Sequence, residues 1–157
     1  MLIAVVSDTH GNTELICRRL QPQKPDMLIF AGDYFRDGEM IARNLKIDFL
    51  GVRGNCDRDA PGGRDEETAI IINKKFYVLH GHQYGVKHSV NRLYYRALEM
   101  KAEVVIYGHT HFPHLEQIDR LWMINPGSAA RPRSSERGSY VMIEMENDKF
   151  LPRLVYI

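Results

Sequence analysis

Polar side chains that can bind metal ions follow five short apolar runs of the sequence. Each cluster combines glycine with aspartate, asparagine or histidine. In chain order the clusters are Ser7-Asp8-Thr9-His10-Gly11-Asn12, Gly32-Asp33, Arg53-Gly54-Asn55-Cys56-Asp57, His80-Gly81-His82 and Gly108-His109-Thr110-His111. Mixed nitrogen and oxygen donors of this kind suit Mn²⁺, Fe, Zn²⁺ or Ni²⁺ better than a copper or iron–sulfur centre. The clusters therefore indicate a metal site, and their donor types leave the choice among these metals open.

The spacing within two clusters suggests how the donors are aimed. Asp8 and His10 are two residues apart, and His109 and His111 repeat that spacing. If each pair continues the geometry of the preceding strand, its two side chains point the same way. Ligands of open α/β sheets bind beyond the carboxyl ends of the strands. We therefore expect seven side chains to converge on one crevice: Asp8, His10, Asp33, Asn55, His80, His109 and His111.

Seven candidate ligands exceed the four that a single tetrahedral zinc ion needs. They suit two metal ions that share a bridging carboxylate and keep positions open for water and substrate. Two ions about 3.5–4 Å apart lower the pKa of a bridging water and clamp a phosphoryl group for in-line displacement. They also offset charge on the non-bridging oxygens, an effect worth about several kcal/mol. The donor set thus predicts metal-assisted cleavage of phosphate esters.

The apolar runs that precede the clusters are predicted to be buried strands. They are four or five residues long and rich in Val, Ile, Leu and aromatic residues, with glycine close behind. The expected strands are Leu2–Val6, Met27–Ala31, Phe49–Val52, Phe76–Leu79 and Val104–Tyr107. Helices are expected at about Thr13–Leu20, Gly38–Leu45 and His88–Lys101, with Asn12 as a cap of the first. Alternation of strands and helices predicts parallel βαβ units.

The pattern changes after residue 111. Short strands joined by tight turns are expected at His114–Ile118, Leu121–Asn125, Ser139–Glu146 and Lys149–Tyr156. A further hairpin is expected from Thr68–Ile72 and Lys75–Leu79, with Asn73-Lys74 as its turn. Parallel units followed by antiparallel strands predict an α/β fold in which two sheets pack together with helices outside.

Bulk composition limits the alternatives. The chain has 157 residues, which is the size of one domain spanning residues 1–157, and its net charge of +1 gives no general attraction to nucleic acid or anionic membrane. Two cysteines, Cys17 and Cys56, fit a reducing compartment, although counting alone leaves a single disulfide open. The first strand begins without a basic leader, and no apolar run reaches the roughly 20 residues of a membrane span. We expect a soluble, cytoplasmic protein with no membrane partner.

The clusters, taken in order, resemble the motifs of the calcineurin-like metallophosphoesterases. The similarity is greatest to the small YfcE-like phosphodiesterase branch, whose Asn-Pro-Gly-Ser element has a counterpart at Asn125-Pro126-Gly127-Ser128. The matching motifs span residues 8 to 128. Five motifs in this order form a specific signal, whereas any one of them alone is weak.

The resemblance implies a four-layer α/β/β/α sandwich and a dinuclear metal centre. Asp8, His10, Asp33 and His111 would hold the first metal ion, with Asp33 as the bridge. Asn55, His80 and His109 would complete the second, and Asp33, Asn55 and His10 would take part in catalysis. Mn²⁺ is the preferred cofactor, ahead of Ni²⁺, Zn²⁺ or Fe. The implied activity is hydrolysis of a small phosphoester, most of all a phosphodiester, by a hydroxide that bridges the two ions.

The motifs do not fix the roles of two residues, Cys56 and His82. Many members of the wider superfamily carry a histidine that can protonate the leaving group where this chain has Cys56, as the YfcE-like branch also does. Because a thiol of pKa about 8.5 replaces imidazole poorly, we expect leaving groups that need little protonation, such as nitrophenolate. Of the two histidines in His80-Gly81-His82, the first is assigned as the ligand and His82 to a supporting position.

Each of these residues also has a simpler interpretation. A single Asp or His after a strand is often only structural, and Arg53, Arg58, Arg131 and Arg133 either meet substrate phosphate or are paired surface charges. The chief alternative function is a protein-binding scaffold with little catalysis, as in the related retromer subunit. That relative lacks the histidine of the Asp-x-His motif, and the presence of His10 here favours catalysis. A nuclease is less expected, since the chain has no basic tract, and the oligomeric state is left open.

Overall fold

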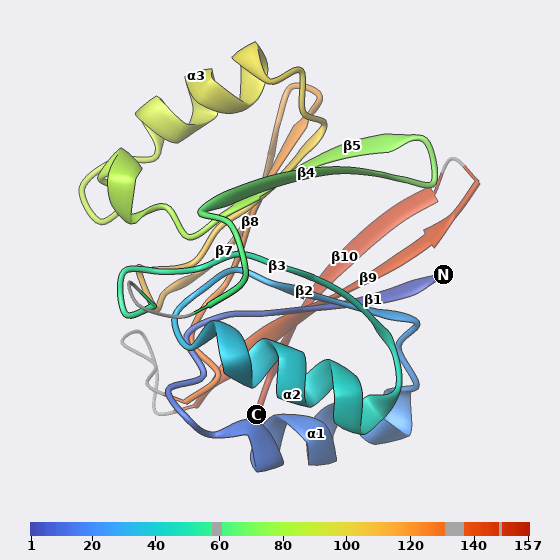
Figure 1. The fold of residues 1–157 in the computed structure, drawn as a ribbon. Coiled ribbons are helices and arrows are strands. Elements are labelled where there is room, and N and C mark those ends of the chain that lie inside the picture. The colour runs from blue at the N-terminus through green and yellow to red at the C-terminus, as the bar shows by residue number, and fades with distance from the viewer. Residues whose placement is uncertain (58–60, 131–136, 148) are drawn as a thin grey trace.

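The computed structural model describes residues 1–57, 61–130, 137–147 and 149–157. Within these ranges the chain forms two five-stranded sheets that stack face to face (Figure 1). The first sheet has the order β10-β9-β1-β2-β3, and its strands are β1 (Leu2–Val6), β2 (Met27–Phe30), β3 (Asp48–Gly51), β9 (Ser139–Glu146) and β10 (Lys149–Tyr156). The second has the order β4-β5-β6-β8-β7, with β4 (Glu66–Ile71), β5 (Lys74–Leu79), β6 (Val104–Ile106), β7 (Pro113–Ile118) and β8 (Leu121–Pro126).

Each sheet is mixed. In the first sheet β1 pairs with β2 and β2 with β3 in parallel, whereas β9 and β10 are added in antiparallel orientation. In the second sheet β5, β6 and β8 are parallel, and β4 and β7 form antiparallel edges. The prediction of early parallel units followed by antiparallel strands is confirmed. The carboxyl ends of the five parallel strands that precede the polar clusters therefore meet on one side of the molecule.

Helices cover the outer faces of the two sheets. The helices α1 (Thr13–Leu20) and α2 (Phe35–Leu45) pack on the first sheet, and α3 (Asn91–Glu99) packs on the second (Figure 1). Two short 3₁₀ turns, η1 (Gln21–Gln23) and η2 (His82–Tyr84), complete the elements. The four layers are those expected from the sequence.

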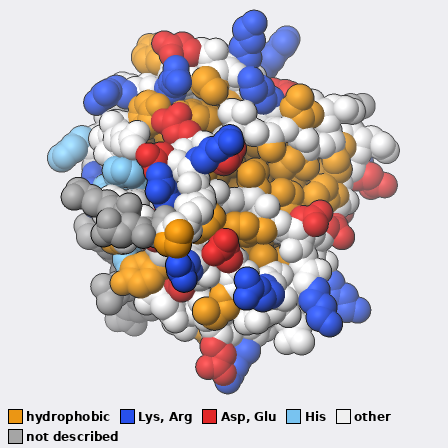
Figure 2. All heavy atoms as spheres, viewed as in Figure 1, with side chains coloured by type: hydrophobic (Ala, Val, Ile, Leu, Met, Phe, Trp, Pro, Cys, Tyr) orange, Lys and Arg blue, Asp and Glu red, His pale blue; other side chains and the backbone are white. Residues whose placement is uncertain are grey.

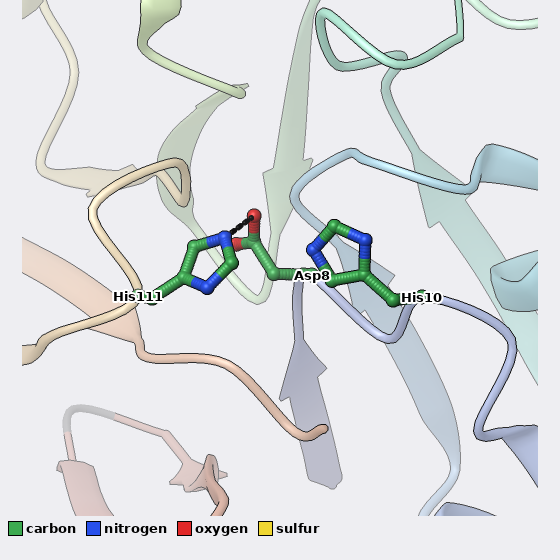
Figure 3. A group of neighbouring side chains, drawn as sticks. All are labelled: Asp8, His10 and His111. Carbon is green, nitrogen blue, oxygen red and sulfur yellow. Dashed lines mark ion pairs between the residues drawn. The ribbon is translucent and has the colours of Figure 1, made fainter. Parts of the chain in front are cut away.

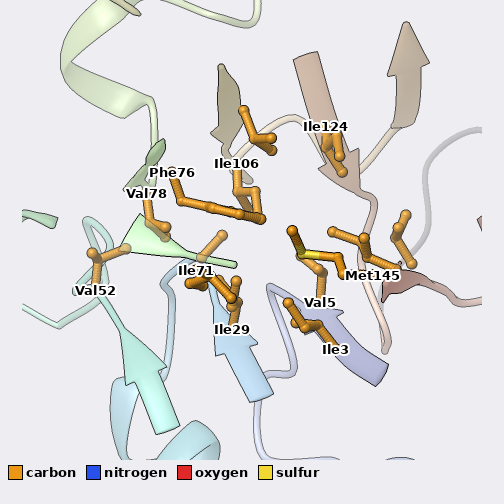
Figure 4. Packing of buried hydrophobic residues seen from close by; sticks show 14 residues of the cluster. Ile3, Val5, Ile29, Val52, Ile71, Phe76, Val78, Ile106, Ile124 and Met145 are labelled. Atoms are coloured by element: carbon orange, nitrogen blue, oxygen red, sulfur yellow. The ribbon is translucent and has the colours of Figure 1, made fainter. Parts of the chain in front are cut away.

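Alternating side chains of each strand build two kinds of core. Ile3 and Val5 of β1 face the second sheet, while Ala4 and Val6 face α1 and α2. All four side chains are fully buried, which explains why this strand is a continuous apolar run. The cluster between the sheets draws on both of them, and Figure 4 shows its side chains meeting across the gap. Burial of this apolar surface is the main force that holds the layers together.

The structure corrects several local predictions. Helix α2 starts at Phe35, earlier than the expected Gly38, and α3 covers only Asn91–Glu99 of the expected range. Asn12 occupies the cap position of α1 but makes no side-chain capping hydrogen bond.

The hairpin turn is also displaced by one residue. Ile72 and Asn73 form it, with φ values of 42° and 63°, so that Lys74 begins β5. Positive φ at both central residues is the geometry of a type I′ turn, whose twist matches that of the strands.

Two further expectations concern the surroundings of the protein. Cys17 and Cys56 both lie in the described part of the chain and are free thiols. Among the described residues, no helix combines the length and apolar character needed to cross a membrane.

Candidate metal centre

The seven predicted ligands gather where five parallel strands end. Four of them follow strands of the first sheet: Asp8 and His10 come after β1, Asp33 after β2 and Asn55 after β3. Those that follow the second sheet, after β5 and β6, are His80, His109 and His111. The first sheet thus contributes carboxylates, an amide and one imidazole, and the second contributes imidazoles alone. Figure 2 shows histidine side chains at the surface on the side of the molecule where these strands end in Figure 1.

One group of donors lies around the carboxylate of Asp8. The side chains of Asp8, His10 and His111 each offer a donor atom, and these atoms lie within 4.8 Å of one another. His111 Nε2 lies 3.1 Å from Asp8 Oδ1, and the rings of His10 and His111 are 5.2 Å apart between centroids. In Figure 3 the Asp8 carboxylate lies between the two imidazoles. Asp8 is fully buried, so its charge requires nearby compensation.

A second group lies deeper between the sheets. Donor atoms of Asp8, Asp33 and His80 also fall within 4.8 Å of one another, and all three residues are buried. His80 Nε2 is 3.3 Å from Asp33 Oδ1 and 4.0 Å from Asp8 Oδ1. The carboxylate common to both groups is that of Asp8, whereas the sequence resemblance implies Asp33 as the bridge. His80, and not His82, lies against the two carboxylates.

His109 borders the second group, and Asn55 directly precedes Cys56, which contacts Asp33. The ring of His109 lies 5.1 Å from that of His80, between centroids, and its backbone N–H donates to Asp8 Oδ2 at 3.2 Å. The Asn55 Oδ1 atom is buried and accepts no hydrogen bond from the described residues. His82 is farther out, with its ring 5.6 Å from that of His80 and 6.0 Å from that of His109.

The backbone at these positions is left-handed. Asp8, His10, Asp33, His109 and His111 have φ between 45° and 68°, a conformation that costs a non-glycine residue roughly 1–3 kcal/mol. The expectation that the pairs Asp8/His10 and His109/His111 continue strand geometry is therefore wrong. Their convergence comes from turned backbone at the strand ends, which the surrounding contacts must hold in place.

Hydrogen bonds from neighbouring loops fix the orientation of Asp8. The Ser7 hydroxyl donates to Asp8 Oδ2 at 2.6 Å, so that oxygen is held by two donors and Oδ1 faces the imidazoles. Ser128 Oγ donates to the backbone carbonyl of Asp8 at 2.8 Å. This contact and the buried Asn125 confirm that the Asn125–Ser128 element lies next to the site.

Asn125 supports the other wall of the site. Its amide Nδ2 donates to the carbonyl of Gly108 at 2.9 Å and to Thr110 Oγ1 at 3.1 Å, while Oδ1 accepts from the N–H of Gly127. The loop that carries His109 and His111 is thereby tied to the end of β8. By composition alone this asparagine belongs to an ordinary turn.

Asp33 is held by Cys56. The Cys56 backbone N–H donates to Asp33 Oδ1 at 2.9 Å, and its thiol donates to Oδ2 at 3.3 Å. Burial, followed by the neighbouring Asp33 carboxylate, raises the pKa of the Cys56 thiol to about 11, so the thiol stays protonated. The buried Asp57 carboxylate in turn accepts N–H groups of Gly54 at 2.8 Å and of Phe35 at 2.9 Å, which joins this loop to the start of α2.

Two glycines allow the loops to approach the carboxylates. A Cβ added at Gly54 would lie 2.1 Å from Asp33 Oδ1, and one at Gly108 would lie 2.8 Å from Asp8 Oδ2 and 2.1 Å from Ser7 Oγ. Contacts this short do not occur for real side chains. Glycine is needed at both positions for close approach.

Electrostatics distinguishes the two inner histidines. Burial alone would lower the pKa of His80, but the carboxylates of Asp33 and Asp8 outweigh it and raise the pKa above the ordinary imidazole value. Burial, with the nearby His80 and Lys87, lowers the pKa of His109 to about 4, so this imidazole is neutral at neutral pH. The pKa of Asp33 lies well below its usual range: burial would raise it, but the hydrogen-bonding and charged neighbours, His80 first, outweigh that effect. Asp33 is therefore ionised.

The donor set fits divalent cations. Asp8 Oδ1, Asn55 Oδ1 and His80 Nε2 are buried and make no hydrogen bond of good geometry with the described residues. The His80 Nδ1–H donates to the carbonyl of Ala31 at 2.7 Å, which directs Nε2 toward the carboxylates. Buried polar atoms left in this state cost about 1–3 kcal/mol each, and a cation among them would remove that cost.

Of the four arginines considered as contacts for substrate phosphate, one lies in the described part of the chain. Arg53 forms an ion pair with Asp65 at 2.9 Å, so of the two interpretations the paired charge is the one found. Arg58, Arg131 and Arg133 lie outside the described residues.

The fold and the five strand-end motifs are those of the calcineurin-like phosphoesterase class, and comparison with known families agrees. The family model of the calcineurin-like phosphoesterase superfamily domain matches residues 1–148, and the chain belongs to this superfamily.

Curated relatives share most of their length with this chain. The probable metallophosphoesterase YsnB of Bacillus subtilis is 35% identical over 152 residues, covering 94% of this chain and 86% of the relative. The phosphodiesterase YfcE of Escherichia coli K12 is 25% identical over 168 aligned positions, covering 92% and 88%.

Solved structures have the same fold. A predicted phosphoesterase from Streptococcus pneumoniae TIGR4 superposes with a TM-score of 0.83 at 25% identity, covering 99% of this chain and 88% of that one. Vps29 of Entamoeba histolytica, crystallised with Zn²⁺, gives a TM-score of 0.82 at 21% identity and covers 99% of both chains. At that identity the second similarity concerns the fold alone.

Proposed function

We propose that this protein is a phosphoesterase that depends on two divalent metal ions and acts on small phosphoesters, with phosphodiesters preferred. The observation that carries the proposal is the meeting of buried donor atoms from both sheets, among them Asp8 Oδ1, Asn55 Oδ1 and His80 Nε2, at the shared strand ends. Membership of the superfamily and the phosphodiesterase among the relatives support it.

The two ions would be held by the two neighbouring groups of donors. The first ion would be held by Asp8, His10, Asp33 and His111, and the second by Asn55, His80 and His109, with Asp33 as the bridge that the family resemblance implies. The carboxylate that contributes to both groups of donors in the structure is that of Asp8. Mn²⁺ is our first choice, and Ni²⁺, Zn²⁺ and Fe are the alternatives. Such ions supply Lewis-acid activation of water and of the phosphoryl group.

The residues of the chain keep this site organised before substrate arrives. The Ala31 carbonyl fixes the ring of His80, and two donors to Asp8 Oδ2 turn Oδ1 inward. Orientation by such neighbours raises ligand strength and avoids reorganisation during reaction. Asp33, Asn55 and His10 are assigned to direct participation in catalysis.

Cys56 shapes the choice of leaving group. It occupies the motif position of the leaving-group histidine found in many members of the superfamily, and its thiol hydrogen is directed at Asp33. A thiol engaged in this way protonates a departing alkoxide poorly. The enzyme is therefore expected to cleave esters of acidic alcohols, such as nitrophenyl esters, faster than alkyl esters.

The proposal is tested by hydrolysis of bis(p-nitrophenyl) phosphate. Metal-stripped protein should be inactive and should regain activity with added Mn²⁺, and Asp33→Asn or His109→Ala should abolish turnover. His88→Ala, a histidine exposed at the surface, is the matched control and should retain it. Circular dichroism should show that the variants remain folded.

Activity that survives both metal removal and the two substitutions would overturn the proposal. So would a folded, metal-loaded protein that hydrolyses no phosphoester with any of the four metals but forms a stable complex with another protein. The second result would favour a scaffold.

A further inference from the structure

A cavity of about 260 Å³ opens beside the candidate metal centre. We call it the Arg53 cavity, and its walls include Arg53, Asn55, Asp57, Asp65, His82 and Gln83. Asn55 belongs both to this cavity and to the predicted ligand set. The cavity therefore adjoins the second ion position, on the side of Asn55 and His82, and a substrate bound there would extend into it.

The walls of the Arg53 cavity offer both hydrogen-bond donors and acceptors. Nε and Nη2 of Arg53 both donate to the same oxygen of Asp65, at 3.2 Å and 2.9 Å. Within the described part of the chain, this pairing engages two of the five guanidinium N–H groups and one of the two carboxylate oxygens. The Gln83 side chain, which is exposed, adds an amide with both capacities.

The charges of these walls do not favour a second anion. Arg53 is the cation among the described lining residues, and the Asp65 carboxylate already neutralises it. Asp57 adds another carboxylate, whose oxygens accept two backbone N–H groups. A carboxylate or second phosphate on the substrate would therefore meet a paired cation and an additional negative charge, while hydroxyl groups would find partners.

The volume of the cavity limits the size of the substrate's ester group that can bind there. A volume of 260 Å³ equals about nine waters at roughly 30 Å³ each. A polyol between glycerol and a pentose sugar fits this space.

We infer that the Arg53 cavity binds an uncharged polyol ester group of the substrate, so that the enzyme acts on phosphoesters of glycerol-like or pentose-like alcohols. The inference rests on the proposed phosphoesterase function. Arg53 and Gln83 donate to the polyol hydroxyls, and Asp65 accepts from them. These residues select the substrate through its alcohol and take no part in bond cleavage.

Three matched diesters test the inference. Glyceryl, propyl and carboxyethyl esters of p-nitrophenyl phosphate release the same nitrophenolate, so differences in kcat/KM report on the second ester group. With Mn²⁺-loaded protein, the glyceryl diester should exceed the propyl diester by about tenfold, the value of one or two net hydrogen bonds. The carboxyethyl diester should be the slowest.

Two variants test whether residues of the Arg53 cavity cause the selectivity among the diesters. Gln83→Ala should lower the glyceryl-to-propyl ratio, whereas the exposed control Gln117→Ala should keep it. Asp65→Asn leaves Arg53 without its carboxylate partner and should raise the ratio of carboxyethyl to propyl turnover. The matched control Asp119→Asn, in the turn between β7 and β8, should leave that ratio as it is.

The outcomes separate the two levels of inference. If none of the diesters is hydrolysed, the proposed function fails. If all are hydrolysed with equal kcat/KM, or if the carboxyethyl diester is the best substrate of the unmodified protein, the function stands and the polyol assignment is wrong. A selectivity that Gln83→Ala and Asp65→Asn both leave intact would also reject it.

Discussion

Replacing Gly54 by alanine tests whether the activity depends on the position of the Asp33 carboxylate. A Cβ at this position would lie 2.1 Å from Asp33 Oδ1 and 2.4 Å from the Asp33 backbone nitrogen. Ordinary contact begins at 3.4 Å, so the oxygen would have to retreat from 2.1 to 3.4 Å and the nitrogen from 2.4 to 3.4 Å. Because the nitrogen belongs to the main chain, rotation of the Asp33 side chain alone cannot relieve the clash.

These displacements exceed what a catalytic site tolerates. Productive geometry is held to within about 0.5 Å, and a misplacement of about 1 Å lowers the rate by roughly 100-fold. We therefore expect Gly54→Ala to lower kcat/KM on bis(p-nitrophenyl) phosphate by at least about 100-fold. Overpacking of the loop should also reduce the free energy of unfolding by about 1–3 kcal/mol.

Gly51→Ala is the matched control for this substitution. A Cβ at Gly51 would lie 2.3 Å from the far end of the Phe49 ring, a half-buried side chain that packs against α2. The control should lose stability in urea yet keep its metal content and its kcat/KM. Metal content is measured by elemental analysis after dialysis against a metal-free buffer.

Two results would refute the reasoning. A Gly54→Ala protein that is destabilised but retains full metal content and turnover would show that Asp33 does not act from its observed position. Equal losses of activity in Gly54→Ala and Gly51→Ala would trace the effect to general destabilisation of the fold around β3.

Two further predictions concern the metal-free protein. Asp57→Asn replaces one of the two carboxylate oxygens that accept from Gly54 and Phe35 by an NH2 group, and should lower the free energy of unfolding by about 1–3 kcal/mol; an unchanged urea midpoint would contradict this. Because the pKa of His109 is lowered to about 4, the unfolded chain binds a proton that the folded chain does not, and stability should fall as pH drops from about 6.5 toward that value. His109→Gln should flatten this dependence in urea titrations across that range, whereas identical slopes would exclude His109 as its source.

The positions of strands and ligands follow from patterns that lie close together in the sequence. β1 is predicted to the residue because both of its faces are buried, which leaves a continuous apolar run with a polar cluster behind it. The shared edge of the five clusters follows from parallel pairing, which the alternation of strands and helices predicts. Metal chemistry follows from the donor types.

Features that depend on contacts between residues far apart in the sequence could not be predicted. Helix α2 begins before Gly38 because the distant Asp57 accepts the N–H of Phe35. Gly38 lies inside the helix, where a Cβ would come within 2.6 Å of the Phe30 ring, so glycine here serves close packing and does not mark a helix end. Asn125 reads as a turn residue because its partners, Gly108 and Thr110, are 17 and 15 positions away.

The division of donors between the sheets has a mechanical consequence. The two sheets are otherwise joined largely by an apolar interface, which is non-directional and tolerates small sliding of one sheet over the other. Cations coordinated by side chains that follow both sheets would fix the position of one sheet relative to the other. Separating the sheets would then require release of the ions, so occupancy adds to the free energy of unfolding, by about 2.7 kcal/mol at a free metal concentration 100 times the dissociation constant.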